Sequence, residues 1–280
     1  MIVQLLNIIY NNKRKFIKFI LCIFYLIFLN LKKKGVNQKY KIVAISYANK
    51  RYKRQLEINK ISALEIGKVN EFYEFGPENI EKSFQIKNKD ILSRKRGNGY
   101  WLWKPYFILK TLKEKLNEGD YLIYSDAGIF YINSTYNIIE LLKKNNIDIW
   151  AYQLKHKERV WTKRDAFLLI GVDYPNFTES YQYMAGIQIY RKSNLSVGFL
   201  EKVLYYSTDK RIITDEQNSL GFRNYKGFKE NRHDQTVLSL LIKKYGFNFT
   251  NIKTPLTFCI YRRLKFIDFN DLKKKCKEKK

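Results

Sequence analysis

Short apolar runs alternate with longer mixed segments along this chain. Residues 41–46 (KIVAIS) and 121–125 (YLIYS) are short, apolar and rich in β-branched or aromatic residues, as buried strands are. A helix is expected to start near Pro105, because proline suits the first helical turn. Expected helices cover about residues 51–66, 105–116, 135–144, 163–170, 194–206 and 234–245, and further expected strands cover about 68–75, 147–152, 186–191 and 247–250.

This alternation of strands and helices predicts an α/β domain with a mostly parallel sheet. In such a sheet, ligands bind beyond the carboxyl ends of the strands. The 280 residues suffice for one large domain with a buried core. Neither the G-x-G-x-x-G dinucleotide fingerprint nor a P-loop lysine motif occurs, so the sequence supports neither of these modes of phosphate binding.

The first forty residues are apolar and basic. Residues 19–29 (FILCIFYLIFL) form an unbroken apolar run with lysines on both sides. This run is shorter than the stretch of about 20 residues that spans a bilayer, and no small-residue cleavage site follows it. We therefore expect residues 1–38 to form a membrane-associating, monotopic helix on an anionic surface, with a helix packed on the domain as the alternative.

Charge narrows the class of partner. The chain holds 53 Lys and Arg against 26 Asp and Glu, a net charge of +27, which favours nucleic acid, phosphates or an acidic membrane. A composition rich in Lys, Ile, Asn, Tyr and Phe is also typical of an AT-rich genome, which accounts for part of this basicity. Residues 1–40 carry eight Lys or Arg and no acid, and residues 262–280 carry nine against three. We expect a domain at 39–265 and a basic tail at 266–280.

The cysteine and histidine content argues against a disulfide framework and against a zinc site. The three cysteines, Cys22, Cys259 and Cys276, are far apart and odd in number, which indicates a reducing compartment and no disulfide framework. With only two histidines, His156 and His233, the sequence does not support a zinc site built by the protein.

A cluster of cations, glycines and tryptophans spans residues 94–106 (RKRGNGYWLWKPY). The glycines form a flexible entry to the helix near Pro105, whose N-terminus, together with Lys104, suits a phosphate group. The rings of Trp101 and Trp103 suit stacking on a base or a sugar. The alternative is that both tryptophans anchor the core and the arginines are solvated.

Two further clusters place carboxylates beside expected elements. Asp126 follows the 121–125 strand, at the edge of the sheet where ligands bind, and carboxylate oxygens are what Mg²⁺ or Mn²⁺ prefers. The alternative is an ordinary turn residue. Asp234 opens the helix near 234–245, where it is either a helix cap or, with His233, a base or substrate ligand.

Five motifs occur in order along the chain. They are GYWLWKPY at 99–106, GDYLIYSDAG at 119–128, WTKRD at 161–165, QYMAG at 182–186 and RHDQ at 232–235. In this order they resemble a family of bacterial GT-A-type glycosyltransferases of capsule and lipopolysaccharide biosynthesis clusters, and the resemblance covers residues from about 41 to 262. Together they imply a single GT-A-like domain and a hexosyltransferase-like, nucleotide-sugar-dependent enzyme.

The resemblance also implies roles for particular residues. Residues 125–127 (Ser-Asp-Ala) occupy the place of the usual D-x-D, which leaves Asp126 as the metal or ribose contact and leaves strict dependence on Mn²⁺ or Mg²⁺ open. The segment at 184–186 resembles the sugar-facing N-x-G of related transferases without its asparagine. The implied donor-binding residues are Ser46 and Tyr47 at the nucleotide, Arg96 and Lys104 at the diphosphate, and Lys163, Arg164, Asp165, Gln182 and Gly186.

Glycosyl transfer requires stabilisation of the departing diphosphate and orientation of the incoming hydroxyl. If the enzyme inverts configuration, Asp234 is the expected base and His233 the substitute. If it retains configuration, this assignment fails. The expected partners are a nucleotide-sugar donor, a glycan or lipid-linked glycan acceptor and an anionic membrane surface. The expected location is the cytoplasmic face of the bacterial inner membrane, with peripheral or monotopic attachment.

Two rival functions follow from the same sequence. A basic chain with interleaved Arg and Trp at 94–104 is compatible with nucleic-acid binding, but no nucleic-acid-binding motif occurs, so no nucleic-acid partner is expected. The altered D-x-D is also compatible with a noncatalytic, membrane-bound scaffold of a glycan-assembly complex.

Overall fold

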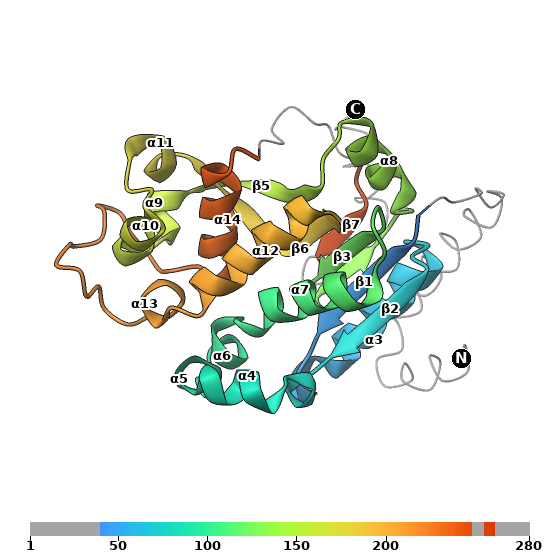
Figure 1. The fold of residues 1–280 in the computed structure, drawn as a ribbon, viewed down its shortest axis with the longest axis horizontal. Helices are drawn as coiled ribbons and strands as arrows, with labels where there is room; N and C mark the ends of the chain where they lie inside the picture. The colour runs from blue at the N-terminus through green and yellow to red at the C-terminus, as the bar shows by residue number, and fades with distance from the viewer. Residues whose placement is uncertain (1–39, 248–254, 261–280) are drawn as a thin grey trace, which may run out of the picture.

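A five-stranded sheet forms the centre of the computed structural model, which describes residues 40–247 and 255–260 (Figure 1). The strand order is β2-β1-β3-β6-β5. The strands are β1 (Ile42–Tyr47), β2 (Glu71–Phe75), β3 (Tyr121–Ser125), β5 (Ile149–Lys157) and β6 (Tyr181–Arg191).

Four of these strands run in one direction. β1 pairs in parallel with β2 and β3, whereas β6 is antiparallel to both β3 and β5. The predicted α/β class with a mostly parallel sheet is therefore confirmed, and the described residues form a single domain. The strand expected at 186–191 is longer than predicted, because β6 begins at Tyr181.

Burial explains why the two central runs form strands. Every residue of β1 and β3 is buried, so these β-branched and aromatic side chains fit only between layers that cover both faces. Helix α3 (Lys53–Glu65) packs on β1 and β2, α7 (Trp103–Lys115) on β3, and α14 (Asp234–Lys244) on β6. Helix α12 (Asn194–Ser207) packs between α7 and α14. In Figure 1 the later helices gather around β5 and β6, away from the β2 edge.

The remaining elements are short. Strand β4 (Ile129–Tyr131) pairs with β7 (Phe258–Ile260), and α8 (Tyr136–Lys144) is the helix expected at 135–144. The other elements are η1 (Lys50–Tyr52), η2 (Pro77–Asn79), α4 (Lys82–Lys87), α5 (Lys89–Leu92), α6 (Gly97–Tyr100), α9 (Glu158–Trp161), α10 (Arg164–Ile170), α11 (Pro175–Thr178) and α13 (Lys210–Ile213). Residues 214–233, between α13 and α14, contain no helix or strand and are called the 214–233 loop below.

Several predictions fall outside the described residues. These are the N-terminal helix at 1–38, the basic tail at 266–280 and most of the strand expected at 247–250, of which only Phe247 is described, outside any strand. Within 40–247 and 255–260, no helix combines the length and the apolarity that crossing a bilayer requires.

Candidate functional site

The ammonium group of Lys104 lies between two carboxylates from distant parts of the chain. Lys104 belongs to the first turn of α7, and its side chain is only 4 % exposed. Its Nζ lies 2.6 Å from Oδ2 of Asp234 and 3.2 Å from Oδ1 of Asp126. It also donates to the carbonyl oxygen of Ala185 at 3.3 Å. The structure thus brings the predicted residues Lys104, Asp126 and Asp234 into one cluster.

Asp126 is the accessible member of this cluster, with 44 % of its side chain exposed. It follows the last residue of β3, as predicted, and the hydroxyl of Tyr124 donates to its Oδ1 at 2.6 Å. Its backbone N–H donates to the carbonyl of Gly186 at 2.9 Å. A Cβ atom on Gly186 would lie 3.0 Å from Oδ2 of Asp126, so the glycine leaves room for the carboxylate.

A buried asparagine side chain fixes the turn that carries Asp126. Asn59 of α3 is fully buried, and its Nδ2 donates to Oγ of Ser125 at 3.0 Å and to the carbonyl of Ile129 at 2.8 Å. These bonds tie both ends of the turn to α3. The position of the Asp126 carboxylate is therefore set by the packing of the core as well as by its own contacts.

Burial and neighbouring charges shift the pKa values of three groups in this cluster. Burial alone would lower the pKa of Lys104, but the carboxylates of Asp126 and Asp234 raise it above its ordinary value. Burial raises the pKa of Asp234, which outweighs the opposing effect of Lys104. Burial and the Asp126 carboxylate raise the pKa of Tyr124 well above its ordinary value. At neutral pH, Lys104 is a cation and Tyr124 a hydrogen-bond donor.

Asp234 and His233 differ from their expected roles at the start of α14. The cap position of the helix is held by His233, whose side chain makes no capping bond, and Asp234 is the first helical residue. The capping alternative for Asp234 is therefore wrong. Its side chain is 10 % exposed and its Oδ2 faces Lys104, so its contacts favour a counter-ion over an exposed base.

His233 is also enclosed. Its Nδ1 lies 2.7 Å from the carbonyl oxygen of Ile213, and its ring stacks on Trp101 with centroids 5.3 Å apart. Its Nε2 lies 3.8 Å from Asp215. Burial lowers the pKa of His233 in spite of the Ile213 carbonyl, so the ring is neutral at neutral pH and Nδ1 donates.

A left-handed turn leads into α7. The five consecutive residues from Gly97 to Trp101 all have positive φ, although non-glycine residues enter this region at a cost of about 1–2 kcal/mol each. Trp103 then stacks on Tyr47 with ring centroids 3.7 Å apart, and its Nε1 donates to the carbonyl of Gly97. Trp103 is 4 % exposed, so it anchors the core, as the alternative to ligand stacking predicted.

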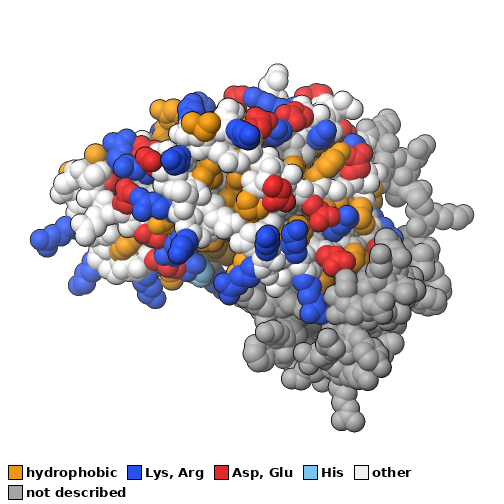
Figure 2. Space-filling view, turned by 90° about the horizontal axis from the view of Figure 1, so that it is seen from below, with side chains coloured by type: hydrophobic (Ala, Val, Ile, Leu, Met, Phe, Trp, Pro, Cys, Tyr) orange, Lys and Arg blue, Asp and Glu red, His pale blue; other side chains and the backbone are white. Residues whose placement is uncertain are grey.

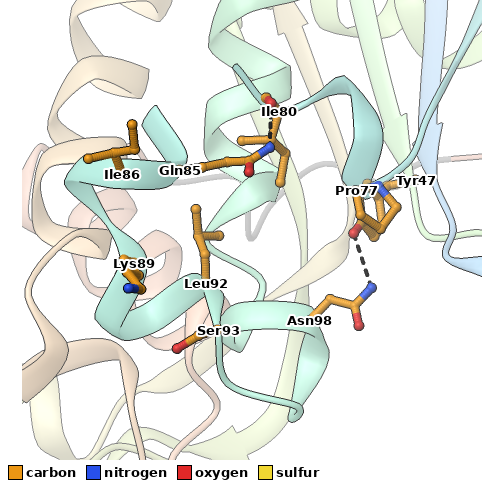
Figure 3. A pocket seen from close by; sticks show the side chains of 9 residues that line it. All are labelled: Tyr47, Pro77, Ile80, Gln85, Ile86, Lys89, Leu92, Ser93 and Asn98. Atoms are coloured by element: carbon orange, nitrogen blue, oxygen red, sulfur yellow. Dashed lines mark hydrogen bonds between the residues drawn. The ribbon is translucent and has the colours of Figure 1, made fainter. Parts of the chain in front are cut away.

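A cavity of about 480 Å³ opens beside this turn. In Figure 3, Tyr47 at the end of β1 and Pro77 lie on one side of it, and Leu92 and Lys89 of α5 lie on the other. Asn98 closes the lower rim, and its Nδ2 donates to the hydroxyl of Tyr47 at 3.1 Å. The walls are largely apolar, with polar groups at the rim.

The predicted residues Ser46 and Tyr47 are the last two residues of β1. Tyr47 lines the cavity, and burial raises the pKa of its hydroxyl although the hydrogen bond with Asn98 opposes this. Ser46 is 1 % exposed, and its Oγ has no hydrogen-bond partner among the described residues.

Arg96, predicted at the diphosphate, is paired with the 214–233 loop. Its guanidinium lies 3.0 Å from Asp215 and 3.0 Å from Glu230, and Arg94 lies 3.1 Å from Glu216. The side chains of Arg96 and its two partners are 34–45 % exposed. Such exposed ion pairs contribute about 0–1 kcal/mol each, so they leave Arg96 able to exchange its partner.

The WTKRD residues contact the same loop. Asp165 is fully buried and accepts from the backbone N–H of Ser219 at 2.7 Å. Arg164 pairs with Asp173 at 2.7 Å, and the Nζ of Lys163 donates to the carbonyl of Glu216 at 2.5 Å. Burial lowers the pKa of Lys163. These contacts organise the 214–233 loop, and a part for the three residues in donor binding stays a prediction.

Gln182 lies in a buried network that reaches the Lys104 cluster. It donates to Glu158 at 3.0 Å and accepts from Gln235 at 2.8 Å. Gln235 in turn accepts from the backbone N–H of Ala185 at 3.3 Å, and the carbonyl of Ala185 faces Lys104. Glu158, which is fully buried, also pairs with Lys243. Gln182 is therefore placed to position the cluster rather than to touch a ligand.

Sequence reasoning missed Tyr124, Asn59, Glu158 and Gln235. Alternation along a strand offered a signal for Tyr124, because residues two apart share a face and Asp126 follows two positions later. Asn59 and Glu158 carried no local signal, since the partners described above lie 24 to 85 residues away in the sequence. Gln235 stood in the RHDQ motif without a role of its own.

The donor groups of this site do not fit a divalent cation between Asp126 and Asp234. Both carboxylates already face the ammonium of Lys104, which lies where such a cation would be held. Within residues 40–247 and 255–260, no group of three or more His, Cys, Asp and Glu side chains converges on one point. Asp126 alone retains exposed carboxylate surface.

Comparisons with known proteins give similarity in fold at low sequence identity. The sequence matches no protein-family model and no curated protein. The structure is similar to apo mouse xyloside xylosyltransferase 1, with 12 % identity, a TM-score of 0.39 and coverage of 74 % of this chain and 82 % of that one. For the apo bifunctional glycosyltransferase WbbM, identity is 8 %, the TM-score 0.43 and coverage 74 % and 38 %. The Mn/GDP form of core-mannan synthase A from Aspergillus fumigatus has 8 % identity and a TM-score of 0.38, with coverage of 75 % of this chain and 71 % of that one.

Proposed function

We propose that this protein transfers a sugar from a nucleotide-diphosphate-sugar donor to a glycan or lipid-linked glycan acceptor. One observation carries the proposal: an exposed carboxylate, Asp126, is fixed by Tyr124 and Lys104 at the carboxyl end of β3. A cavity lies at the carboxyl end of the neighbouring strand β1. In open α/β sheets this edge is where ligands bind.

The cavity beside Tyr47 is the proposed site of the donor nucleoside. Its volume of about 480 Å³ and its apolar walls with a polar rim are typical of small-molecule sites. Asn98 and Lys89 supply hydrogen-bond donors at its edge. Asp126 then accepts from sugar hydroxyl groups, and Arg96 exchanges its exposed carboxylate partners for the donor diphosphate.

A surface glycan of the capsule or lipopolysaccharide type is the proposed product. The motifs quoted from residues 99–235 and the basic apolar segment at 1–38 support this part of the proposal. Attachment at the cytoplasmic face of a bacterial inner membrane would place the enzyme beside nucleotide-sugar donors and lipid-linked acceptors. On the face shown in Figure 2, Lys and Arg lie interspersed with Asp and Glu, which does not favour a nucleic-acid partner.

To test this proposal, a panel of nucleotide sugars is incubated with the full chain. Binding of each donor and release of nucleoside diphosphate are measured separately. We expect at least one donor to bind and to be hydrolysed slowly or transferred. Asp126→Asn should lose turnover by about 10²-fold or more, because the amide supplies one acceptor oxygen instead of two and no charge. Glu118→Gln is the matched control, since this exposed carboxylate lies near the amino end of the same strand.

Each outcome separates the candidate functions. Turnover that depends on Asp126 but not on Glu118 supports a transferase. Donor binding without turnover, even with acceptor glycans present, would instead support the noncatalytic scaffold. Absence of both binding and turnover across the panel would contradict the proposal.

A further inference from the structure

Three oxygen atoms of the protein surround the Lys104 ammonium group. Its Nζ donates to the Ala185 carbonyl at 3.3 Å and forms ion pairs with Asp234 at 2.6 Å and Asp126 at 3.2 Å. Because the Lys104 side chain is only 4 % exposed, the geometry does not support the predicted direct contact between Lys104 and the donor. The ammonium group instead serves the protein's own carboxylates.

The aromatic surroundings of Lys104 hold this group in place. Its Nζ lies 5.0 Å from the ring centroid of Tyr124 and 5.9 Å from that of Trp103. Trp103 is fixed by its stack on Tyr47, and Tyr124 is buried in the central strand β3. Aromatic faces attract cations, so both rings favour the charged group where it is. A swing of the side chain into solvent would give up all of these contacts.

The Lys104 ammonium group lies between two carboxylates, in the position that a bound metal cation would otherwise take. A divalent ion needs several oxygen ligands at short distances, and carboxylates are its preferred ones. Here Asp126 accepts a hydrogen bond from Tyr124 and forms an ion pair with Lys104 at 3.2 Å, and Asp234 is paired with Lys104 at 2.6 Å. A metal ion between them would have to displace a buried ammonium group of the same sign of charge.

We infer that Lys104 takes the place of a divalent cation in this site, so that nucleotide-sugar binding requires no Mn²⁺ or Mg²⁺. The inference rests on the proposed function for the identity of the donor, but the cation itself can be tested without it. Lys104 is then a positioning residue, because it orients the exposed Asp126 carboxylate and touches no substrate. Neutralisation of the donor diphosphate falls to Arg96.

Two titrations of the full chain by calorimetry test this inference. In the first, Mn²⁺ alone is added to the wild type and to Lys104→Ala. We expect no binding at this site in the wild type and a gain of one Mn²⁺ site in Lys104→Ala, because both carboxylates are then free. The gained site should disappear in Lys104→Ala/Asp126→Asn. If Lys104→Ala does not fold, the titrations of the wild type and of Asp126→Asn still show whether Mn²⁺ binds at this site. The change in Asp126→Asn is at an exposed side chain.

In the second titration, UDP and GDP are added in excess EDTA and again in excess Mn²⁺. We expect the dissociation constants in the two conditions to agree within about twofold, a difference well below the tenfold that corresponds to about 1.4 kcal/mol. Binding of Mn²⁺ by the wild type that is lost in Asp126→Asn would overturn the inference, as would nucleotide binding weakened more than tenfold by EDTA. If neither nucleotide binds in either condition, the proposed function is weakened, while the Mn²⁺ titration still decides the role of Lys104.

Discussion

Replacing Lys104 by methionine keeps most of the length and the apolar stem of the side chain but removes its charge. Asp234, whose side chain is 10 % exposed, would then lose its partner at 2.6 Å. Breaking a buried ion pair from one side costs about 3–5 kcal/mol, because it leaves an uncompensated charge. The pair with Asp126, which is 44 % exposed, adds at most about 1 kcal/mol. We therefore expect the free energy of unfolding to fall by about 3–5 kcal/mol.

For a domain of this size, that loss corresponds to a fall in Tm of roughly 6–20 °C. Urea unfolding followed by tryptophan fluorescence gives the free energy directly. The deficit should shrink as the pH falls, because burial already raises the pKa of Asp234 and a protonated carboxyl has no charge to bury. Removing both charges, in Lys104→Met/Asp234→Asn, should cost less than the sum of the two single changes.

Lys113→Met is the matched control on the same helix. Lys113 pairs with Glu201 at 2.5 Å, but its side chain is 45 % exposed, so its loss should cost less than about 1 kcal/mol. The reasoning would be refuted if Lys104→Met were no less stable than Lys113→Met. Additivity of the two changes in the double variant would also refute it, because the charges would then be independent of each other.

Two further changes test the surroundings of Asp126, and a third tests Arg96 beside the 214–233 loop. Gly186→Ala places a Cβ 3.0 Å from Oδ2 of Asp126. We expect the rate of sugar transfer to fall by about tenfold or more, because the Asp126 carboxylate has to shift. A wild-type rate would show that the carboxylate can move without loss of activity. Tyr124→Phe removes a hydrogen bond to a charged group worth about 1.5–3 kcal/mol, so it should lower the rate of transfer more than it lowers Tm, and an unchanged rate would contradict this. Arg96→Ala breaks two exposed ion pairs worth about 0–1 kcal/mol each, so stability should change little while nucleotide affinity falls, and unchanged affinity would show that Arg96 faces elsewhere.

The sequence predicted the central strands and the place of Asp126 because both depend on local pattern. Residues 42–45 and 121–124 are apolar without interruption, and a residue that follows a buried strand emerges at its carboxyl end. Helix α7 was recognised from Pro105, and it begins two residues earlier, at Trp103. These features need no knowledge of distant parts of the chain.

The role of Lys104 depends on distance in space instead. Its partners Ala185 and Asp234 lie 81 and 130 residues away in the sequence, and they meet it only because β6 runs antiparallel beside β3. The sequence pattern does not give strand direction. The contacts of Lys104 with Ala185 and Asp234 could therefore not be predicted, and the donor-binding role expected for Lys104 could not be checked against them. The three short helices between residues 82 and 100 also escaped prediction, because each is too short to show a helical period.

The left-handed turn at residues 97–101 makes a partly exposed segment as intolerant of substitution as the core. A Cβ at Gly97 would lie 2.3 Å from the indole of Trp101, and one at Gly99 would lie 2.6 Å from the backbone of Leu92. Both glycines also have positive φ, where other residues are strained. A library of random variants should therefore show two sharp minima of survival here, whereas the exposed neighbours Ser93 and Lys95 should accept most residues.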